Sequence, residues 1–449
     1  MDKPGRVVVV GDLMLDVLFV PEQGLFVRAG GSAANVALAL AGEGRTVTVV
    51  GRTGPDPNGR FLRETLAAAG VELPVPPARE RATGFSVMHR HGAADRVVYV
   101  ERGANRCLES DAVGPPANLA RARVLDRAAW LHVSAYGLLE PGPGAVARGL
   151  ARTARDRGIP ISVDAGVPQA FPGLDAEAGL DLLRLGLDPG PDFLILSEPM
   201  SDHLGYPAAQ RAVAPRRGFG CAVVTGGSSG AWVDGERLGL DGETDHPDAD
   251  VSGAGDAFVG GFIAAGLGGA GPREAARLAN RIAARYVAAG PGWRRVACQE
   301  APVLVSACLF DTASAYDGEA RPRPAELGDG DPALRLYLPV CPEQAGGLTT
   351  PRPPAEIRTT GGGAAVMAGR ASVVTRDGRD VTPAFLKGAR RVAELARATG
   401  ATWAILKEGS PSCGATRVDD GTFSGRKVPG EGVTVAALRR MGVSVSPGE

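Results

Sequence analysis

Two stretches of this sequence carry residues whose types and spacing suit chemistry. The first, Asp250 to Asp256, reads Asp-Val-Ser-Gly-Ala-Gly-Asp and places a carboxylate among small residues that let a backbone approach a ligand closely. The carboxylate can take a proton from an alcohol, while backbone N–H groups hold phosphoryl oxygens. In the second stretch, past residue 300, Cys308, Cys341 and Cys413 each follow an apolar run. We therefore expect two chemistries in one chain.

Asp256 has a structural interpretation and a catalytic one. A carboxylate in the first turn of a helix is favoured by the helix dipole as an ordinary cap. The neighbouring Gly253, Ala254 and Gly255 favour catalysis, because they leave room for an anion hole beside the carboxylate. Phosphoryl transfer to a hydroxyl needs a base near the nucleophile and fixed dipoles around the phosphoryl oxygens, and this segment supplies both.

The three cysteines past residue 300 are predicted metal ligands. Parallel strands finish on one edge of a sheet, so sulfurs that follow three such strands can converge. Each cysteine alone would more often be a small buried side chain. Three thiolates suit zinc or an iron–sulfur cluster. All five histidines lie before residue 247, which disfavours a mixed Cys and His zinc site and favours a cluster with one open iron position.

Alternating strands and helices must position both groups. The first 300 residues alternate β-branched runs with Ala- and Leu-rich stretches: 7–10, 33–41, 47–50, 61–69, 130–133, 161–163, 193–196 and 222–225. This rhythm predicts a doubly wound parallel sheet with helices on both faces, which binds ligands beyond the carboxyl ends of its strands. The segments Gly30 to Asn35 and Gly253 to Phe258 each open a predicted helix, where N–H groups face a ligand.

A domain boundary is expected between residues 298 and 302. The segment Gly290-Pro291-Gly292-Trp293 breaks a helix, and Gln299 to Pro302 precedes a fresh apolar run. We predict domains over 1–298 and 302–449. The second has the length of one domain, about 150 residues, and again alternates strands and helices, so a smaller α/β domain is expected.

Composition restricts the partners. The 449 residues include 49 basic and 50 acidic ones, so charge gives no reason to expect nucleic acid or an anionic membrane as a partner. No apolar run approaches the roughly 20 residues of a membrane span, and no signal-peptide core follows Met1. Six cysteines are too sparse for a disulfide scaffold. A cytoplasmic protein that acts on small soluble molecules is expected.

The segment Asp250 to Asp256 resembles the second signature of the PfkB/ribokinase-like carbohydrate and nucleoside kinases. Three further segments agree with that family over residues 5 to 298: Gly11 to Asp16, Gly30-Gly31 with Asn35, and Gly51 to Gly59. The resemblance implies a ribokinase-like sheet with a small β lid around Phe85 to Tyr99, ATP and Mg²⁺ as cofactors, and a homodimer formed through the lid. It allows a monovalent cation near Asp250.

The same resemblance assigns roles to individual residues. It makes Asp256 the base, Gly253, Ala254 and Gly255 the anion hole, Asp16, Gly30, Gly31 and Asn35 the acceptor-binding residues, and Thr225 and Gly227 part of the ATP site. Where the family usually carries Asn-x-x-Glu, this chain reads Ser197-Glu198-Pro199-Met200. That departure affects the positioning of magnesium.

Five motifs of the second domain resemble the thiouracil desulfidase family. They are Ser306-Ala307-Cys308-Leu309, Tyr316-Asp317-Gly318, Pro339 to Gln344, Thr350 to Glu356, and Lys407 to Gly414. The resemblance implies a 4Fe-4S cluster on Cys308, Cys341 and Cys413, whose open iron takes sulfur from a thiolated pyrimidine. It gives Glu343 and Ser410 a role in orienting the base or moving protons. Ser314 stands where the family often has a further cysteine.

A bifunctional enzyme for the salvage of modified nucleosides is the expectation that joins the two halves. The kinase half would phosphorylate a sugar or nucleoside, and the other half would remove sulfur from thiolated pyrimidines. Two alternatives stay open: a cluster that senses redox state or iron and regulates the kinase, and a degenerate kinase fold that only binds substrate for an active desulfidase.

Overall fold

The computed structural model describes most of the chain: residues 5–20, 22–91, 94–108, 124–166, 175–205, 218–240, 251–288, 296–298, 300–328, 330, 335–358 and 361–449. Asp250, with the cation predicted near it, lies outside these residues. In the described part, no helix is both long and apolar enough to span a bilayer.

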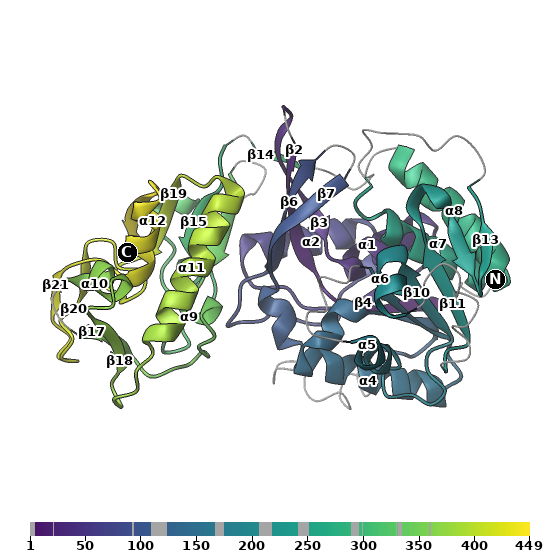
Figure 1. Ribbon diagram of the computed structural model, residues 1–449, viewed down its shortest axis with the longest axis horizontal. Coiled ribbons are helices and arrows are strands. Elements are labelled where there is room, and N and C mark those ends of the chain that lie inside the picture. The colour runs from purple at the N-terminus through teal and green to yellow at the C-terminus, as the bar shows by residue number, and fades with distance from the viewer. Residues whose placement is uncertain are drawn as a thin grey trace.

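A large sheet forms the centre of the N-terminal body (Figure 1). In spatial order its strands are β13 (Glu236–Leu238), β12 (Ala231–Val233), β11 (Cys221–Thr225), β10 (Phe193–Ser197), β9 (Ile161–Ala165), β8 (Ala128–Ser134), β1 (Arg6–Val10), β4 (Val47–Val50) and β5 (Val71–Glu72). All neighbours from β11 to β5 pair in parallel, and β12 and β13 add an antiparallel edge. Valine-rich strands such as β1 suit this sheet because both of its faces are buried.

Helices cover both faces of the large sheet, as predicted. One face is covered by α1 (Ser32–Gly42), α2 (Pro57–Ala68), α7 (Ala254–Leu267) and α8 (Pro272–Ala288). The other is covered by α4 (Pro141–Asp156), α5 (Ala176–Leu183) and α6 (Glu198–His203). This confirms the doubly wound architecture.

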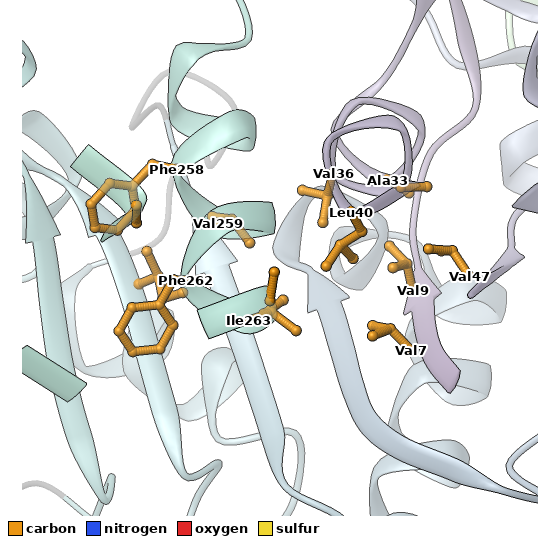
Figure 2. Packing of buried hydrophobic residues seen from close by; sticks show 14 of the residues in the cluster. Val7, Val9, Ala33, Val36, Leu40, Val47, Phe258, Val259, Phe262 and Ile263 are labelled. Atoms are coloured by element: carbon orange, nitrogen blue, oxygen red, sulfur yellow. The ribbon is translucent and has the colours of Figure 1, made fainter. Parts of the chain in front are cut away.

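Helices α1 and α7 pack closely side by side on the sheet (Figure 2). Val36 and Leu40 of α1 lie opposite Val259 and Ile263 of α7. A Cβ added at Gly260 would come within 2.6 Å of the Ala39 Cβ, so the glycine permits this close approach. The approach brings the first turns of the two helices together, where the predicted kinase residues lie.

A second sheet forms the predicted lid, in the order β14 (Val296–Cys298), β3 (Gly24–Gly30), β2 (Met14–Val20), β6 (Gly84–His91) and β7 (Ala94–Glu101). Its two faces differ, as the alternation of strand side chains requires. Asp16, Arg28 and Ser86 lie on the inner face and bond to one another. Leu15, Val17, Val27, Phe85 and Val87 lie on the outer face and are fully buried.

The C-terminal body is a smaller α/β domain. Its parallel sheet has the order β16 (Tyr337–Val340), β15 (Val303–Ser306), β19 (Trp403–Lys407) and β22 (Ser444–Gly448). Its helices are α9 (Pro342–Ala345), α10 (Gly362–Met367), α11 (Thr382–Thr399) and α12 (Val433–Arg440). Two antiparallel pairs complete it: β17 (Ala355–Arg358) with β18 (Ser372–Thr375), and β20 (Arg417–Asp419) with β21 (Lys427–Pro429).

The outer lid face is buried against this C-terminal domain in one continuous core. Phe85 and Val87 of the lid share a cluster with Leu304, Leu338 and Val392 of the C-terminal domain. The lid therefore lies between the two bodies (Figure 1). Its outer face is already covered by the same chain, so the predicted pairing of two lids would have to use another surface.

Candidate active sites

The first site centres on Asp256, in the first turn of α7. Gly253 precedes this helix with a φ of 86°, and a Cβ there would lie 2.7 Å from the Tyr286 hydroxyl, so glycine is required. Two residues of α1 hold the carboxylate: Asn35 Nδ2 donates to Oδ2 at 2.8 Å, and Ser32 Oγ donates to Oδ1 at 3.0 Å. The Asp256 carboxylate is thus held by two side chains of α1 and does not cap its own helix.

The environment of Asp256 suits a base near neutral pH. Removal from solvent raises the pKa of this carboxyl to about 7, and the negative charges of Asp164 and, less strongly, Asp16 add to the rise. The hydrogen bonds from Asn35 and Ser32 oppose it. A carboxylate with this pKa can accept a proton from a hydroxyl at physiological pH.

The residues predicted to bind the acceptor lie around this base. Asp16 accepts hydrogen bonds from Arg28 Nε at 3.3 Å and from Ser86 Oγ at 2.7 Å. A Cβ at Gly30 would lie 2.2 Å from the Asp16 carboxylate, so the two segments touch. The Oδ1 atom of Asn35 is buried and has no hydrogen-bond partner among the described residues. It is an acceptor available to a ligand hydroxyl.

The predicted ATP-binding residues follow the neighbouring strands β10 and β11. Thr225 ends β11 in register with Ser197 of β10, and Gly227 opens the short turn that follows. Ser197, one of the departures from the family pattern, begins α6: its Oγ accepts from Met200 N at 3.2 Å and donates to the Gly166 carbonyl. The altered segment therefore holds a helix start directly beside the predicted nucleotide site.

The sequence did not predict a buried polar group that includes Asp164, a residue whose charge acts on Asp256. His132 of β8 is fully buried; its Nδ1 lies 2.9 Å from Ser162 Oγ and its Nε2 lies 3.4 Å from Asp164 Oδ1. His132 lies on β8 and its two neighbours lie on β9, and a lone histidine in an apolar run gives no signal of such neighbours. Asp164 lies beside His132, and its charge acts on Asp256.

The second site is a cavity of about 380 Å³ in the C-terminal domain, lined by all three predicted cysteine ligands. Cys308 follows β15, Cys341 follows β16, and Cys413 lies in the turn after β19. These strands are parallel neighbours in the order β16, β15, β19, so the predicted convergence of their ends is observed.

The donor set of this cavity is three cysteine thiols, which suit soft metals. Burial raises the pKa of the Cys308 thiol to about 12 and raises those of Cys341 and Cys413 as well. Thiolates in such a place need bound metal to balance their charge. Three sulfurs spread around one cavity fit an iron–sulfur cluster.

A carboxylate, an arginine and a serine shape the walls of this cavity. Glu343 pairs with Arg352, whose Nε lies 2.6 Å from Glu343 Oε2. Arg352 Nη2 also reaches the Ser314 carbonyl at 3.2 Å and Cys341 Sγ at 3.8 Å. Ser410, predicted with Glu343 as catalytic, accepts from the backbone N–H groups of Ser412 and Cys413, both at 3.1 Å. Ser410 therefore orients the Cys413 turn in addition to facing the cavity.

Glu408 organises the segment after Cys413, a role that the sequence prediction missed. Its buried carboxylate accepts from the N–H groups of Ala415 at 3.0 Å, Thr416 at 3.1 Å and Arg417 at 2.5 Å. The signal available in the sequence was a carboxylate five residues before a ligand, next to glycine and serine. By itself it does not distinguish an internal acceptor from a solvated side chain.

Replacing Glu408 by alanine should weaken metal binding. The change leaves three backbone N–H groups without their acceptor, so we expect a loss of about 2–4 kcal/mol in the unfolding free energy and less iron per chain. Glu408→Gln keeps one oxygen of the same shape and should cost less than half as much. Thermal unfolding and iron analysis of the full chain measure both effects. Equal iron content and melting temperature in Glu408→Ala would contradict this role.

Two family models match the chain, one over each body. The model described as pfkB family carbohydrate kinase matches residues 5–290, and the model described as 2-thiouracil desulfurase matches residues 303–449. A fructokinase of Klebsiella pneumoniae is 29% identical over 293 residues, which are 62% of this chain and 90% of that protein.

Two solved structures are also similar. The adenosine kinase of Sinorhizobium meliloti has a TM-score of 0.56 at 18% identity, over 64% of this chain and 95% of its own, a likeness of fold. The 4Fe-4S-dependent thiouracil desulfidase TudS is 41% identical over 33% of this chain and 91% of its own, with a TM-score of 0.29. The segment between the two matched ranges contains β14, the last strand of the lid sheet.

Proposed function

This chain belongs to the pfkB family of carbohydrate kinases and carries a 2-thiouracil desulfurase domain at its C-terminal end, and from this premise we propose one salvage enzyme with two activities. The predicted fusion of these two enzyme domains is confirmed. In the proposal, the N-terminal domain transfers phosphate from ATP with Mg²⁺ to a nucleoside or sugar hydroxyl. The C-terminal domain removes sulfur from a thiolated pyrimidine.

In the proposed kinase reaction, Asp256 accepts the proton of the attacking hydroxyl. Asp16 and the free Oδ1 of Asn35 orient the acceptor, and the N–H groups of Gly253, Ala254 and Gly255 at the start of α7 hold the transferred phosphoryl oxygens. Thr225 and Gly227 contact the nucleotide. The position of Asp256 between the α7 N-terminus and the side chains of α1 supports this assignment.

In the proposed desulfidation, Cys308, Cys341 and Cys413 hold a 4Fe-4S cluster. When bound, the cluster would supply an open iron that takes up the thione sulfur, while water supplies the oxygen of the resulting oxo base. Glu343 and Ser410 lie on the cavity wall, where they can orient the base or move a proton. The observation that carries this proposal is the meeting of three cysteines from neighbouring parallel strands at one cavity of about 380 Å³.

Thiolated nucleosides test the two activities together. The full chain, purified without oxygen, is incubated with ATP, Mg²⁺ and 2- or 4-thiouridine, while sulfide and nucleotide products are measured. We expect sulfide release and a phosphorylated nucleoside. Phosphorylation of free hexoses alone, with no nucleoside converted, would count against a shared salvage role.

The kinase rate should depend on pH through Asp256. The carboxyl works as a base only when deprotonated, so a pKa of about 7 predicts a rate that falls as pH drops below 7 and levels off above it. The measurement is kcat/KM for the acceptor between about pH 5.5 and 9 at saturating ATP and Mg²⁺. A rate that stays constant down to pH 5.5 would show that this carboxyl is not the base.

A further inference from the structure

The C-terminal domain contacts the kinase on both sides of the connection between its lid and its large sheet. The last part of this connection, residues 79–83, lies directly before β6 of the lid and is called here the hinge segment. On the lid side, Arg391 of α11 lies 3.8 Å from Glu101 of β7. On the other side, Asn58 Nδ2 of α2 donates to the Tyr337 carbonyl of β16 at 3.1 Å. The domain therefore bridges two parts that a moving lid would separate.

The hinge segment is bonded directly to the surroundings of one predicted ligand, Cys341. Gln344 Nε2 donates to the Glu80 carbonyl at 2.9 Å, and Gln344 lies in α9, the helix that begins right after Cys341. Ala313 N donates to the Arg79 carbonyl at 2.7 Å. The residue after Ala313 is Ser314, whose carbonyl lies 3.7 Å from Cys341 Sγ. Both bonds therefore link the hinge to segments that touch the cysteine.

On its kinase side the hinge segment is fixed by buried bonds. Thr83 N and Oγ1 donate to Asp56 Oδ2 at 2.6 and 3.0 Å, and Asp56 Oδ1 accepts from Gly59 N in the first turn of α2. Thr83 and Cys341 line the same small cavity of about 30 Å³. The hinge segment therefore lies close to the cysteine site.

In this arrangement the lid reaches the base: Gly30 at the end of β3 touches the Asp16 carboxylate of β2, and Ser32, two residues later, donates to Asp256. We propose that the C-terminal domain regulates the kinase within the same chain: a loaded cysteine site fixes the hinge segment with the lid over Asp256, and loss of the metal group frees it. The proposal rests on the proposed function of both sites. Metal binding orders the loops that carry its ligands, and those loops hold the hinge through Gln344 and Ala313.

Hydrogen exchange tests the proposal without any kinase substrate. The full chain loaded with iron is compared with full-length Cys413→Ala, and exchange is followed in peptides that cover residues 79–89. We expect faster exchange of this segment in Cys413→Ala, because weaker bonds to the Glu80 and Arg79 carbonyls leave the segment freer to open and expose its own N–H groups, such as that of Thr83. Faster exchange around residue 413 alone, with residues 79–89 unchanged, would overturn the proposal.

Kinase kinetics supply the second readout. With uridine, adenosine, ribose or fructose as acceptor, we expect the acceptor KM of Cys413→Ala to rise about 5-fold or more, with a smaller change in kcat. Equal KM values in loaded and unloaded protein would overturn the coupling and leave the kinase function intact. If neither protein phosphorylates any acceptor, the proposed kinase function fails, while the exchange result still decides the coupling.

A pair of interface variants separates coupling from general loosening. Gln344→Ala keeps all three cysteines but removes the bond to Glu80 and leaves the Ala313–Arg79 bond, so its KM should depend less on metal loading than that of the unmodified chain. Arg391→Ala removes a contact of the same domain with the lid edge, away from the cysteines, and should retain that dependence. A dependence of the same size in Gln344→Ala and in the unmodified chain would overturn the assigned path.

Discussion

Asp256→Asn should lower the kcat of phosphoryl transfer by about 10²–10⁴-fold, the range expected for loss of a general base. Asparagine has nearly the same shape and can still accept the hydrogen bond from Ser32, but it cannot take a proton from the acceptor. Desulfidation by the other domain should be unchanged. ADP formation measures the kinase, and thione consumption measures the desulfidase in the same samples.

A matched variant distinguishes a base from a helix cap. Asp175 caps α5 by accepting from Ala178 N at 2.9 Å, and asparagine caps a helix about as well as aspartate. Asp175→Asn should therefore leave kcat within about twofold. If Asp256→Asn also leaves kcat within about twofold, Asp256 only caps α7 and the chemistry lies elsewhere.

Cys413→Ala should abolish desulfidation and strip iron from the protein. It removes one of three sulfurs at the cavity, and the buried Cys413 turn offers no other soft ligand in the part of the chain described by the structure. Iron analysis and loss of thione absorbance are the measurements. Cys221→Ala is the matched control, because Cys221 is buried in β11 of the kinase sheet and should change neither. Equal iron in Cys413→Ala and the unmodified chain would exclude Cys413 as a ligand.

The sequence predicts the parts of both sites that depend on local pattern. The proximity of the three cysteines could be predicted because each follows an apolar run and parallel strands end on one edge of a sheet. The strands β16, β15 and β19 are parallel neighbours, as this prediction requires. The start of a helix at Gly253 followed from glycine and small residues before an apolar run, and α7 begins there. The two-domain organisation likewise followed from the repeated alternation.

Features that depend on distant contacts could not be predicted. Burial is the main cause of the raised pKa of Asp256, and the charges of Asp164, which β9 brings near, and Asp16, which the lid brings near, add to it. The role of Glu408 depends on a backbone turn that points three N–H groups at one carboxylate. The bonds from Gln344 and Ala313 to the hinge segment exist only because two domains pack together. No spacing in the chain encodes them.

Metal content and thione consumption, measured on one anaerobic preparation, test the central claim most directly. The full chain is analysed for iron, zinc and sulfide and is then incubated with 2- and 4-thiouracil while the thione absorbance is followed. We expect about four irons and four sulfides per chain and loss of the thione band. Zinc or no metal, with both thiones unchanged, would contradict this claim and leave a kinase whose C-terminal domain has another role.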